Sequence, residues 1–300
     1  MEIIFLGTSS AVHSKERNHP SIAVKAFGEV ILFDCGEGTQ KQLLFTTVSP
    51  MKISKIFISH YHGDHILGLP GLLQSMSLNG REEKLTIYGP KGLDKIKDAI
   101  YSFGYCAIEF PVEFVEIDTG IIVDNEKYVI SAQQVKHNIL TFAYSIEEKK
   151  KPRFLRKKAI ELGVPVGPAF GRLHNGEEIE IDGRIIKPEE VLGEPRKGIK
   201  ITYSGDTTPC EEMILFAKES TVLIHEATFV MEDEVNAVEH SHSTSADAAM
   251  IARDSKSKKL IITHISTRYD KKHEKILLNE AQEVFENTEL AKDLMEIKLN

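Results

Sequence analysis

One short loop constrains the fold of this chain more than any other feature. Residues 60–65 read His-Tyr-His-Gly-Asp-His, so three imidazoles and one carboxylate fall within six positions. Residues 55–59 before it are typical of a short buried strand, and residues 66–78 after it are typical of an apolar helix. The hexapeptide is therefore predicted to be a strand-to-helix loop at the edge of a sheet.

The residue types in this loop favour a catalytic metal centre. Imidazole nitrogens and carboxylate oxygens bind a borderline cation such as zinc, and they do so without closing its shell with four thiolates. Such a loop can direct His60 and His62 to one side. It can direct Asp64 and His65 to the other, so that one hexapeptide serves two adjacent metal ions. The alternative is a surface histidine cluster or an ordinary polar loop, which a run as dense as His-x-His-x-Asp-His disfavours.

The composition is that of a globular protein. Three hundred residues with 41% hydrophobic content can form one large core or two smaller ones. No apolar stretch approaches membrane-spanning length and no signal-peptide pattern is evident, so we expect a cytoplasmic protein. The widely separated Cys35, Cys106 and Cys210 predict buried thiols instead of disulfides or a cysteine metal site. A net charge of −8 argues against wholesale coating by nucleic acid but leaves room for local basic patches.

Strand-like and helix-like segments alternate along both halves of the chain. This alternation predicts an α/β protein built from layers. The strand-like segments are residues 2–6, 21–24, 31–34, 55–58, 85–88, 129–132, 142–146, 200–204, 222–225 and 259–263, and the helix-like segments include 93–102, 245–253 and 274–286. The pattern breaks at residues 147–178, which we expect to form a protruding, flexible arm inserted into a single domain of residues 1–300.

Three further candidate ligands, His137, Asp206 and His264, each follow one of the predicted strands. Loops that follow strands converge at one edge of a sheet, which would bring these side chains to the hexapeptide. Each has an ordinary alternative: a turn cap for His137, a helix N-cap for Asp206 and a satisfied core histidine for His264. Their occurrence together with residues 60–65 is what favours a metal site.

This set of residues resembles the metallo-β-lactamase superfamily over essentially the whole chain. The matching motifs are His-x-His-x-Asp-His at 60–65, His137, Gly-Asp-Thr at 205–207 and Thr-His at 263–264. The resemblance implies a four-layered αββα sandwich with a two-metal site along one edge, a site suited to phosphoryl chemistry. It also implies that one metal ion is held by His60, His62 and His137, that the other is held by Asp64, His65 and His264, and that Asp206 bridges the two.

Two further motifs narrow the resemblance to the ribonuclease Z branch, the tRNA 3′-processing endoribonucleases. They are His-Glu-Ala-Thr at 225–228 and His-Ser-Thr at 242–244. The resemblance implies that Glu226 and His242 form a hydrogen-bonded pair beside the metals, in which His242 protonates the departing ribose 3′-oxygen. A carboxylate partner raises the basicity of an imidazole and orients it. The alternative is a structural carboxylate and one of several histidines in a solvated loop.

The inserted segment resembles the flexible arm with which ribonucleases Z grip tRNA. Two stretches resemble the tip of that arm. They are Gly-Val-Pro-Val-Gly-Pro at 163–168, which includes Gly167 and Pro168, and Leu-His-Asn-Gly at 173–176. Seven of the ten residues at 149–158 are basic, namely Lys149, Lys150, Lys151, Arg153, Arg156, Lys157 and Lys158. Such a cluster releases counterions when it binds phosphates, so we expect it to bind tRNA. A solvated basic face is the alternative.

Two other segments resemble the same branch. Residues 13–18 match a Pro-x-Lys-x-Arg-Asn loop that one subgroup carries near the acceptor end of the tRNA. Lys15, Arg17 and Asn18 fit this pattern and are expected to contact RNA, whereas His13 replaces the proline; a polar surface loop is the alternative. Residues 33–40 match a turn in which Asp34 would support a metal-binding histidine.

Together these resemblances imply a zinc-dependent endoribonuclease that cuts precursor tRNA on its 3′ side. It would leave a 3′-hydroxyl on the tRNA and a 5′-phosphate on the trailer, with Asp64 orienting or deprotonating the attacking water. We expect two Zn²⁺ per subunit, although other divalent ions suit the same ligands. The expected partners are precursor tRNA and a second subunit in a homodimer, and neither DNA nor a membrane. The alternatives are a hydrolase of small phosphodiesters or other esters with this fold, or a non-catalytic tRNA-binding module.

Overall fold

The computed structural model describes residues 1–104, 107–269 and 271–299. It divides the chain into two compact units, Met1–Glu147 with Ile199–Asn300, and Glu148–Gly198, which are taken in turn. Cys35 and Cys210 are buried and free, as predicted, and Cys106 lies outside the described residues. Within the described ranges, no helix is long and apolar enough to cross a membrane.

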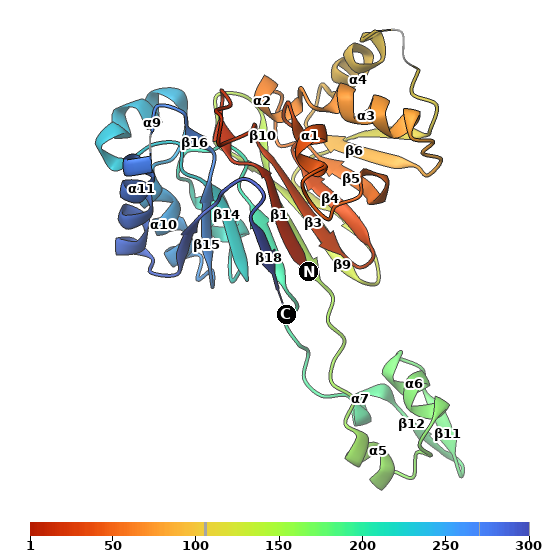
Figure 1. Cartoon of the computed structure of the whole chain (residues 1–300). Coiled ribbons are helices and arrows are strands. Elements are labelled where there is room, and N and C mark those ends of the chain that lie inside the picture. Colours follow the sequence, from red (N-terminus) through yellow and green to blue (C-terminus); the bar gives the residue numbers. More distant parts are fainter. Residues whose placement is uncertain (105–106, 270, 300) are drawn as a thin grey trace. The chain divides into compact units, whose positions relative to one another are not determined.

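Two β-sheets form the centre of the larger unit, and among the described residues each sheet has seven strands (Figure 1). The first sheet, in the order β18-β1-β3-β4-β5-β6-β7, contains β1 (Glu2–Gly7), β3 (Ser21–Ala26), β4 (Glu29–Phe33), β5 (Ile53–Phe57), β6 (Leu85–Gly89), β7 (Val112–Glu116) and β18 (Glu296–Lys298). The second, in the order β17-β15-β14-β13-β10-β9-β8, contains β8 (Gly120–Asp124), β9 (Tyr128–Val135), β10 (Thr141–Glu148), β13 (Lys200–Tyr203), β14 (Val222–Glu226), β15 (Leu260–Thr263) and β17 (Thr288–Leu290). A short parallel pair joins β2 (Ser9–Ser10) to β16 (Ile265–Ser266).

Helices cover the outer face of each sheet (Figure 1). The helices on the side of the first sheet are α1 (Thr39–Leu43), α2 (Gly63–Ile66), α3 (Leu69–Leu78) and α4 (Leu93–Ser102), with the 3₁₀ turn η1 (Pro50–Lys52). Those on the side of the second are α8 (Glu211–Phe216), α9 (Glu234–His240), α10 (Ser245–Asp254) and α11 (Lys271–Val284), with the 3₁₀ turn η2 (Met231–Asp233). The result is the predicted four-layered αββα sandwich.

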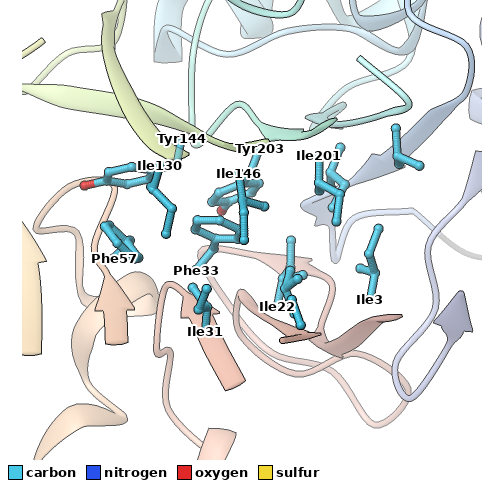
Figure 2. Packing of buried hydrophobic residues seen from close by; sticks show 14 of the residues in the cluster. Ile3, Ile22, Ile31, Phe33, Phe57, Ile130, Tyr144, Ile146, Ile201 and Tyr203 are labelled. Carbon is cyan, nitrogen blue, oxygen red and sulfur yellow. The ribbon is translucent and has the colours of Figure 1, made fainter. Parts of the chain in front are cut away.

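The apolar sequence of β1 follows from burial on both faces of the first sheet. Successive side chains of a strand point to opposite faces. Ile3 and Phe5 therefore join the core between the sheets, while Ile4 and Leu6 join the core beneath the helices. Figure 2 shows the core between the sheets, in which Ile3, Ile22, Ile31, Phe33 and Phe57 of the first sheet face Ile130, Tyr144, Ile146, Ile201 and Tyr203 of the second.

The smaller unit has its own hydrophobic core. It contains α5 (Arg156–Glu161), α6 (Pro168–His174), α7 (Pro188–Val191) and a hairpin of β11 (Ile179–Ile181) and β12 (Arg184–Ile186). Ala159 and Leu173 pack with Ile186 of the hairpin and Val191 of α7. The unit therefore extends to Gly198, beyond the predicted end of the insertion at residue 178, because the hairpin and α7 complete its core.

Candidate metal centre

The structure brings all seven predicted ligand side chains together at the carboxyl ends of strands. Residues 60–65 follow β5, and they carry four of the seven. His137 follows β9, Asp206 follows β13 and His264 follows β15. The four strands pack in the two sheets and end at the same edge of the sandwich, so the side chains converge as the sequence predicts.

His60, His62 and His137 form one group with Asp206. One ligand atom from each lies within 4.8 Å of the others. His60 Nε2 is 3.0 Å from His62 Nδ1, and His62 Nδ1 is 3.4 Å from His137 Nε2. Ligands at zinc–nitrogen bond length in a tetrahedral shell stand about 3.3 Å apart. The three nitrogens therefore have the spacing of ligands around one ion.

Asp64, His65 and His264 form a second group. His65 Nε2 lies 3.3 Å from His264 Nε2, and Asp64 Oδ2 lies 3.5 Å from each of these nitrogens. Asp206 lies between the two groups: its Oδ2 is 3.5 Å from His60 Nε2, and its Oδ1 is 3.4 Å from His264 Nε2. This is the position that the resemblance implies for a bridging carboxylate.

The surroundings of Asp206 test whether a metal ion suits these residues. The residue is 2% exposed, and Oδ1 has no hydrogen-bond partner among the described residues. A buried carboxylate oxygen without a partner carries a large desolvation cost unless a cation balances it. In both groups the ring nitrogens on the side of Asp206 face one another, as in the pairs His60 Nε2–His62 Nδ1 and His65 Nε2–His264 Nε2. The donor set therefore fits bound metal, and it belongs to a metal-dependent site.

Neighbouring groups fix the orientation of the histidines. Asp34 is fully buried, and its Oδ2 accepts a hydrogen bond from His65 Nδ1 at 2.8 Å, which leaves Nε2 free for a ligand. His137 Nδ1 donates to the carbonyl of Ser241 at 2.7 Å, and His264 Nδ1 lies 2.9 Å from Thr228 Oγ1. The support expected from Asp34 is thus present as a direct contact.

The backbone at Gly205 needs a residue without a side chain. Its φ of +60° lies in the left-handed region, and an added Cβ would stand 3.0 Å from Ser59 Cβ and 3.1 Å from the carbonyl of Phe142. Asp206 follows directly. Gly205 therefore allows the chain to turn sharply after β13, at the point where the Asp206 carboxylate reaches the ligand cluster.

Glu226 and His242 form the predicted pair. Glu226 is 1% exposed, and its Oε1 lies 2.8 Å from His242 Nδ1. The carboxylate also accepts hydrogen bonds from the backbone N–H of Thr207 and from Thr228 Oγ1. The ring of His242 lies 5.1 Å from that of His137 and 5.4 Å from that of His264. The pair therefore borders the ligand cluster.

Charge and burial set the protonation of these groups. Burial alone would lower the pKa of His242, but the Glu226 carboxylate outweighs this effect and raises the pKa to about 9. Burial would raise the pKa of Asp64, but His65 and His264 beside it hold that pKa well below its usual range. His242 is therefore suited to donate a proton, and Asp64 is suited to remain ionised.

The N-terminal loop differs in part from expectation. Lys15 is exposed, but the Arg17 guanidinium is buried and forms an ion pair with Glu274 at 2.7 Å. Arg17 also donates to Thr8 Oγ1 and to the carbonyl of Ala291. These contacts occupy the guanidinium within the fold, so they support a structural role and not the predicted direct contact with RNA. Asn18 is half-buried, and its amide donates to the carbonyl of Glu37 at 2.8 Å.

The basic residues of the smaller unit meet the steric requirement for phosphate binding. All seven side chains predicted to contact RNA at 149–158 are exposed, as are Gly167 and Pro168. Lys151 Nζ donates to Asn175 Oδ1 at 2.9 Å, which joins the basic segment to the end of α6. The cluster and the Gly-Pro turn thus lie on one compact unit.

The sequence did not single out several supporting residues. Ser59 donates through Oγ to Asp34 Oδ2 at 2.9 Å, and Tyr203 OH donates to the same oxygen at 2.7 Å. Ser59 directly precedes His60, which was a usable signal. Tyr203 lies far along the chain from Asp34, and its role becomes visible only when the two sheets face each other.

The chain is similar to known proteins over its whole length. A family model described as a Beta-lactamase superfamily domain matches residues 188–265, and one described as Anti-Pycsar protein Apyc1 matches residues 1–99. Ribonuclease Z of Methanothermobacter thermautotrophicus is 50% identical over 299 residues, covering 100% of this chain and 97% of the relative. The chain belongs to the ribonuclease Z family. Ribonuclease Z of Methanocaldococcus jannaschii is 52% identical over 277 residues, covering 90% of this chain and 87% of the relative.

The fold agrees with membership of the ribonuclease Z family. The crystal structure of human tRNase Z, short form, matches with a TM-score of 0.73 at 28% identity, covering 100% of both chains. The metallo-β-lactamase fold and the ribonuclease Z resemblance predicted from the motifs are both confirmed.

Proposed function

We propose that this chain is a metal-dependent endoribonuclease that removes the 3′ trailer from precursor tRNA. It leaves a 3′-hydroxyl on the tRNA and a 5′-phosphate on the trailer. The observation that carries the proposal is full-length similarity to ribonucleases Z, together with the Glu226–His242 pair beside the ligand cluster. The proposal includes two Zn²⁺ per subunit, a homodimer and a cytoplasmic location.

The ligands divide into two sets in this proposal. His60, His62 and His137 would hold one ion, Asp64, His65 and His264 would hold the other, and Asp206 would contribute to both sets. Bound ions supply deprotonated water near neutral pH and positive charge that balances a phosphate in its transition state. The spacing of the nitrogens supports this division, as does Asp206 Oδ1, which has no hydrogen-bond partner in the described part of the chain.

Asp64 orients the attacking water. Its Oδ2 accepts a hydrogen bond from the backbone N–H of Ala11 at 2.9 Å, so the N-terminal loop fixes the carboxylate. A carboxylate held by a backbone N–H can accept a hydrogen bond from a water molecule in a fixed direction. Of the two roles that the resemblance implies for Asp64, orientation therefore has the better physical support.

His242 protonates the leaving ribose 3′-oxygen. With its pKa raised by Glu226, the imidazole is predominantly charged at neutral pH and has a proton to give. Glu226 holds Nδ1, which leaves Nε2 as the donor toward substrate. Because Thr207 and Thr228 fix Glu226 in turn, the proton donor has a defined orientation.

The smaller unit binds the body of the tRNA. Its exposed basic segment at 149–158 offers seven cations to phosphates, and Gly167-Pro168 gives the exposed turn that leads into α6. Lys15 adds an exposed cation on the N-terminal loop. Small phosphodiesters have no need of such a surface, which favours tRNA over the alternative of a small-ester hydrolase.

Incubation of purified protein with a 3′-extended precursor tRNA tests the proposal. We expect a single cut near the acceptor stem, a 3′-hydroxyl on the tRNA, and loss of cleavage with chelator that added Zn²⁺ restores. Mature tRNA without a trailer is the control substrate. Failure of metal-loaded protein to cut, or scattered cuts that a chelator does not affect, would contradict the proposal.

A further inference from the structure

A third group of ligand-type side chains lies outside the seven metal ligands and the Glu226–His242 pair. It consists of His13 and His19 from the N-terminal loop and Glu37 from the turn before α1. One ligand atom from each lies within 4.8 Å of the others. The two imidazole rings meet edge to face, with their centroids 5.0 Å apart.

His19 is a buried imidazole without a partner. The residue is 6% exposed, and within the described part of the chain neither of its ring nitrogens has a hydrogen-bond partner. Buried polar groups nearly always have a hydrogen-bond partner, so a buried imidazole without one indicates a site for a ligand. His13 and Glu37, both exposed, have ligand atoms close enough to share a ligand with it.

The backbone holds two of the three positions side by side. Asn18 Nδ2 donates to the carbonyl of Glu37 at 2.8 Å, and the N–H of Gly36 donates to the carbonyl of Pro20 at 3.0 Å. These bonds flank His19 and Glu37. His13 directly precedes the turn at residues 14–17, in which the Ser14 N–H donates to the carbonyl of Arg17 at 2.8 Å. The buried ligand is thus fixed, and the two exposed ones are free to close on it.

We propose that His13, His19 and Glu37 bind a further divalent transition-metal ion. Two imidazoles and one carboxylate are a donor set that zinc and similar borderline cations accept, with at least one coordination position left open. Ligand atoms around one ion stand about 3.3 Å apart, and these atoms already lie within 4.8 Å of one another, so the exposed side chains need to close by no more than about 1.5 Å. That movement lies within the rotamer freedom of exposed His and Glu.

The site lies next to the nuclease centre but is separate from it. A Cβ on Gly36 would stand 2.5 Å from His19 Cβ and 2.2 Å from the carbonyl of Asp64, so this glycine lets the two segments meet. None of the three proposed ligands belongs to the seven that converge on Asp206. His13 is also the residue that departs from the Pro-x-Lys-x-Arg-Asn pattern, and a ligand role gives that departure a chemical reason.

Metal stoichiometry tests this proposal without reference to activity. The full chain is stripped with chelator and dialysed to equilibrium against a fixed free Zn²⁺ concentration, and zinc and protein are measured by mass spectrometry and amino-acid analysis. We expect the wild type to hold one more ion per chain than His13→Ala/Glu37→Gln, whose substitutions are both on exposed side chains. His240→Ala, an exposed histidine outside all the ligand groups, should match the wild type.

His19→Val provides a second variant that removes the buried ligand. It should also lose one ion per chain while Co²⁺ spectra of the nuclease centre stay unchanged. Equal zinc content in the wild type and the His13→Ala/Glu37→Gln variant would overturn the proposal. Because the exposed-residue variant keeps the core intact, the test stands even if His19→Val fails to fold.

Discussion

Replacing Asp34 by asparagine should weaken metal binding through the tautomer of one histidine. Asp34 Oδ1 accepts from the backbone N–H of Ser59 at 2.7 Å, and Oδ2 accepts from His65 Nδ1 at 2.8 Å. An amide has one acceptor end and one donor end. If the oxygen of the new amide keeps the hydrogen bond from the Ser59 N–H, the NH₂ group of the amide faces His65 Nδ1. The proton of His65 must then move to Nε2, the nitrogen that faces the metal site.

The expected loss is 10- to 100-fold in metal affinity, or about 1.4–2.7 kcal/mol. If the amide turns the other way, its NH₂ faces the Ser59 N–H, and the buried clash costs about 1–3 kcal/mol of unfolding free energy instead. The backbone itself is not strained by the change, because φ at Asp34 is +57° and asparagine tolerates this region. The penalty must therefore appear in metal affinity or in stability.

The assay is competition for Zn²⁺ with a chelator, combined with thermal unfolding of metal-free and metal-loaded protein. Tyr203→Phe is the matched control, because it removes a donor to the same oxygen and leaves the His65 hydrogen bond in place. It should keep metal affinity near that of the wild type. If Asp34→Asn binds metal and unfolds like the wild type, or if both variants lose affinity equally, the tautomer argument is wrong.

Three other predictions follow from the structure. His242→Ala should keep the metal content of the wild type and lose about 10²- to 10⁴-fold in cleavage rate on precursor tRNA, measured by single-turnover assay; near-normal turnover would contradict its role as the acid. Joint replacement of Arg156, Lys157 and Lys158 by alanine should weaken tRNA binding, reduce the slope of log affinity against log salt by about 2 to 3, and spare hydrolysis of bis(p-nitrophenyl) phosphate. An equal loss on both substrates would point to damage at the metal site instead. Gly205→Ala should lower the unfolding free energy by about 1–3 kcal/mol, because a Cβ there meets Ser59 Cβ at 3.0 Å in a left-handed backbone; an unchanged melting temperature would refute this.

The parts of the fold that the sequence predicts well are those with strong local patterns. The predicted helix at residues 93–102 coincides with α4, and each predicted strand overlaps one observed strand. The short edge strands β7 and β8 are not predicted from the sequence. Their residues are largely half-exposed or exposed, and apolar and polar residues do not alternate cleanly along them. An edge strand is stabilised largely by the strand that it pairs with, and its own sequence does not indicate which strand that is.

The candidate site was predictable for a similar reason. Its ligands follow strongly patterned strands, so their positions at one sheet edge could be inferred from order along the chain. Arg17 shows the limit of such reasoning, since a cation in a polar loop suggests solvent or RNA, whereas its partner Glu274 lies 257 positions away. The His13–His19–Glu37 group likewise depends on packing against Gly36 that no local pattern indicates.

The contacts of Asp293 connect the N-terminal loop to a segment far along the chain. Its carboxylate accepts hydrogen bonds from Thr8 Oγ1 at 2.7 Å and from the backbone N–H of Asn18 at 2.7 Å, and β18 pairs with β1 in the first sheet. The loop that fixes Asp64 through Ala11 is therefore itself held in place by residues that carry no candidate ligand. A variant without residues 290–299 would keep all seven candidate ligands but lose the support of this loop.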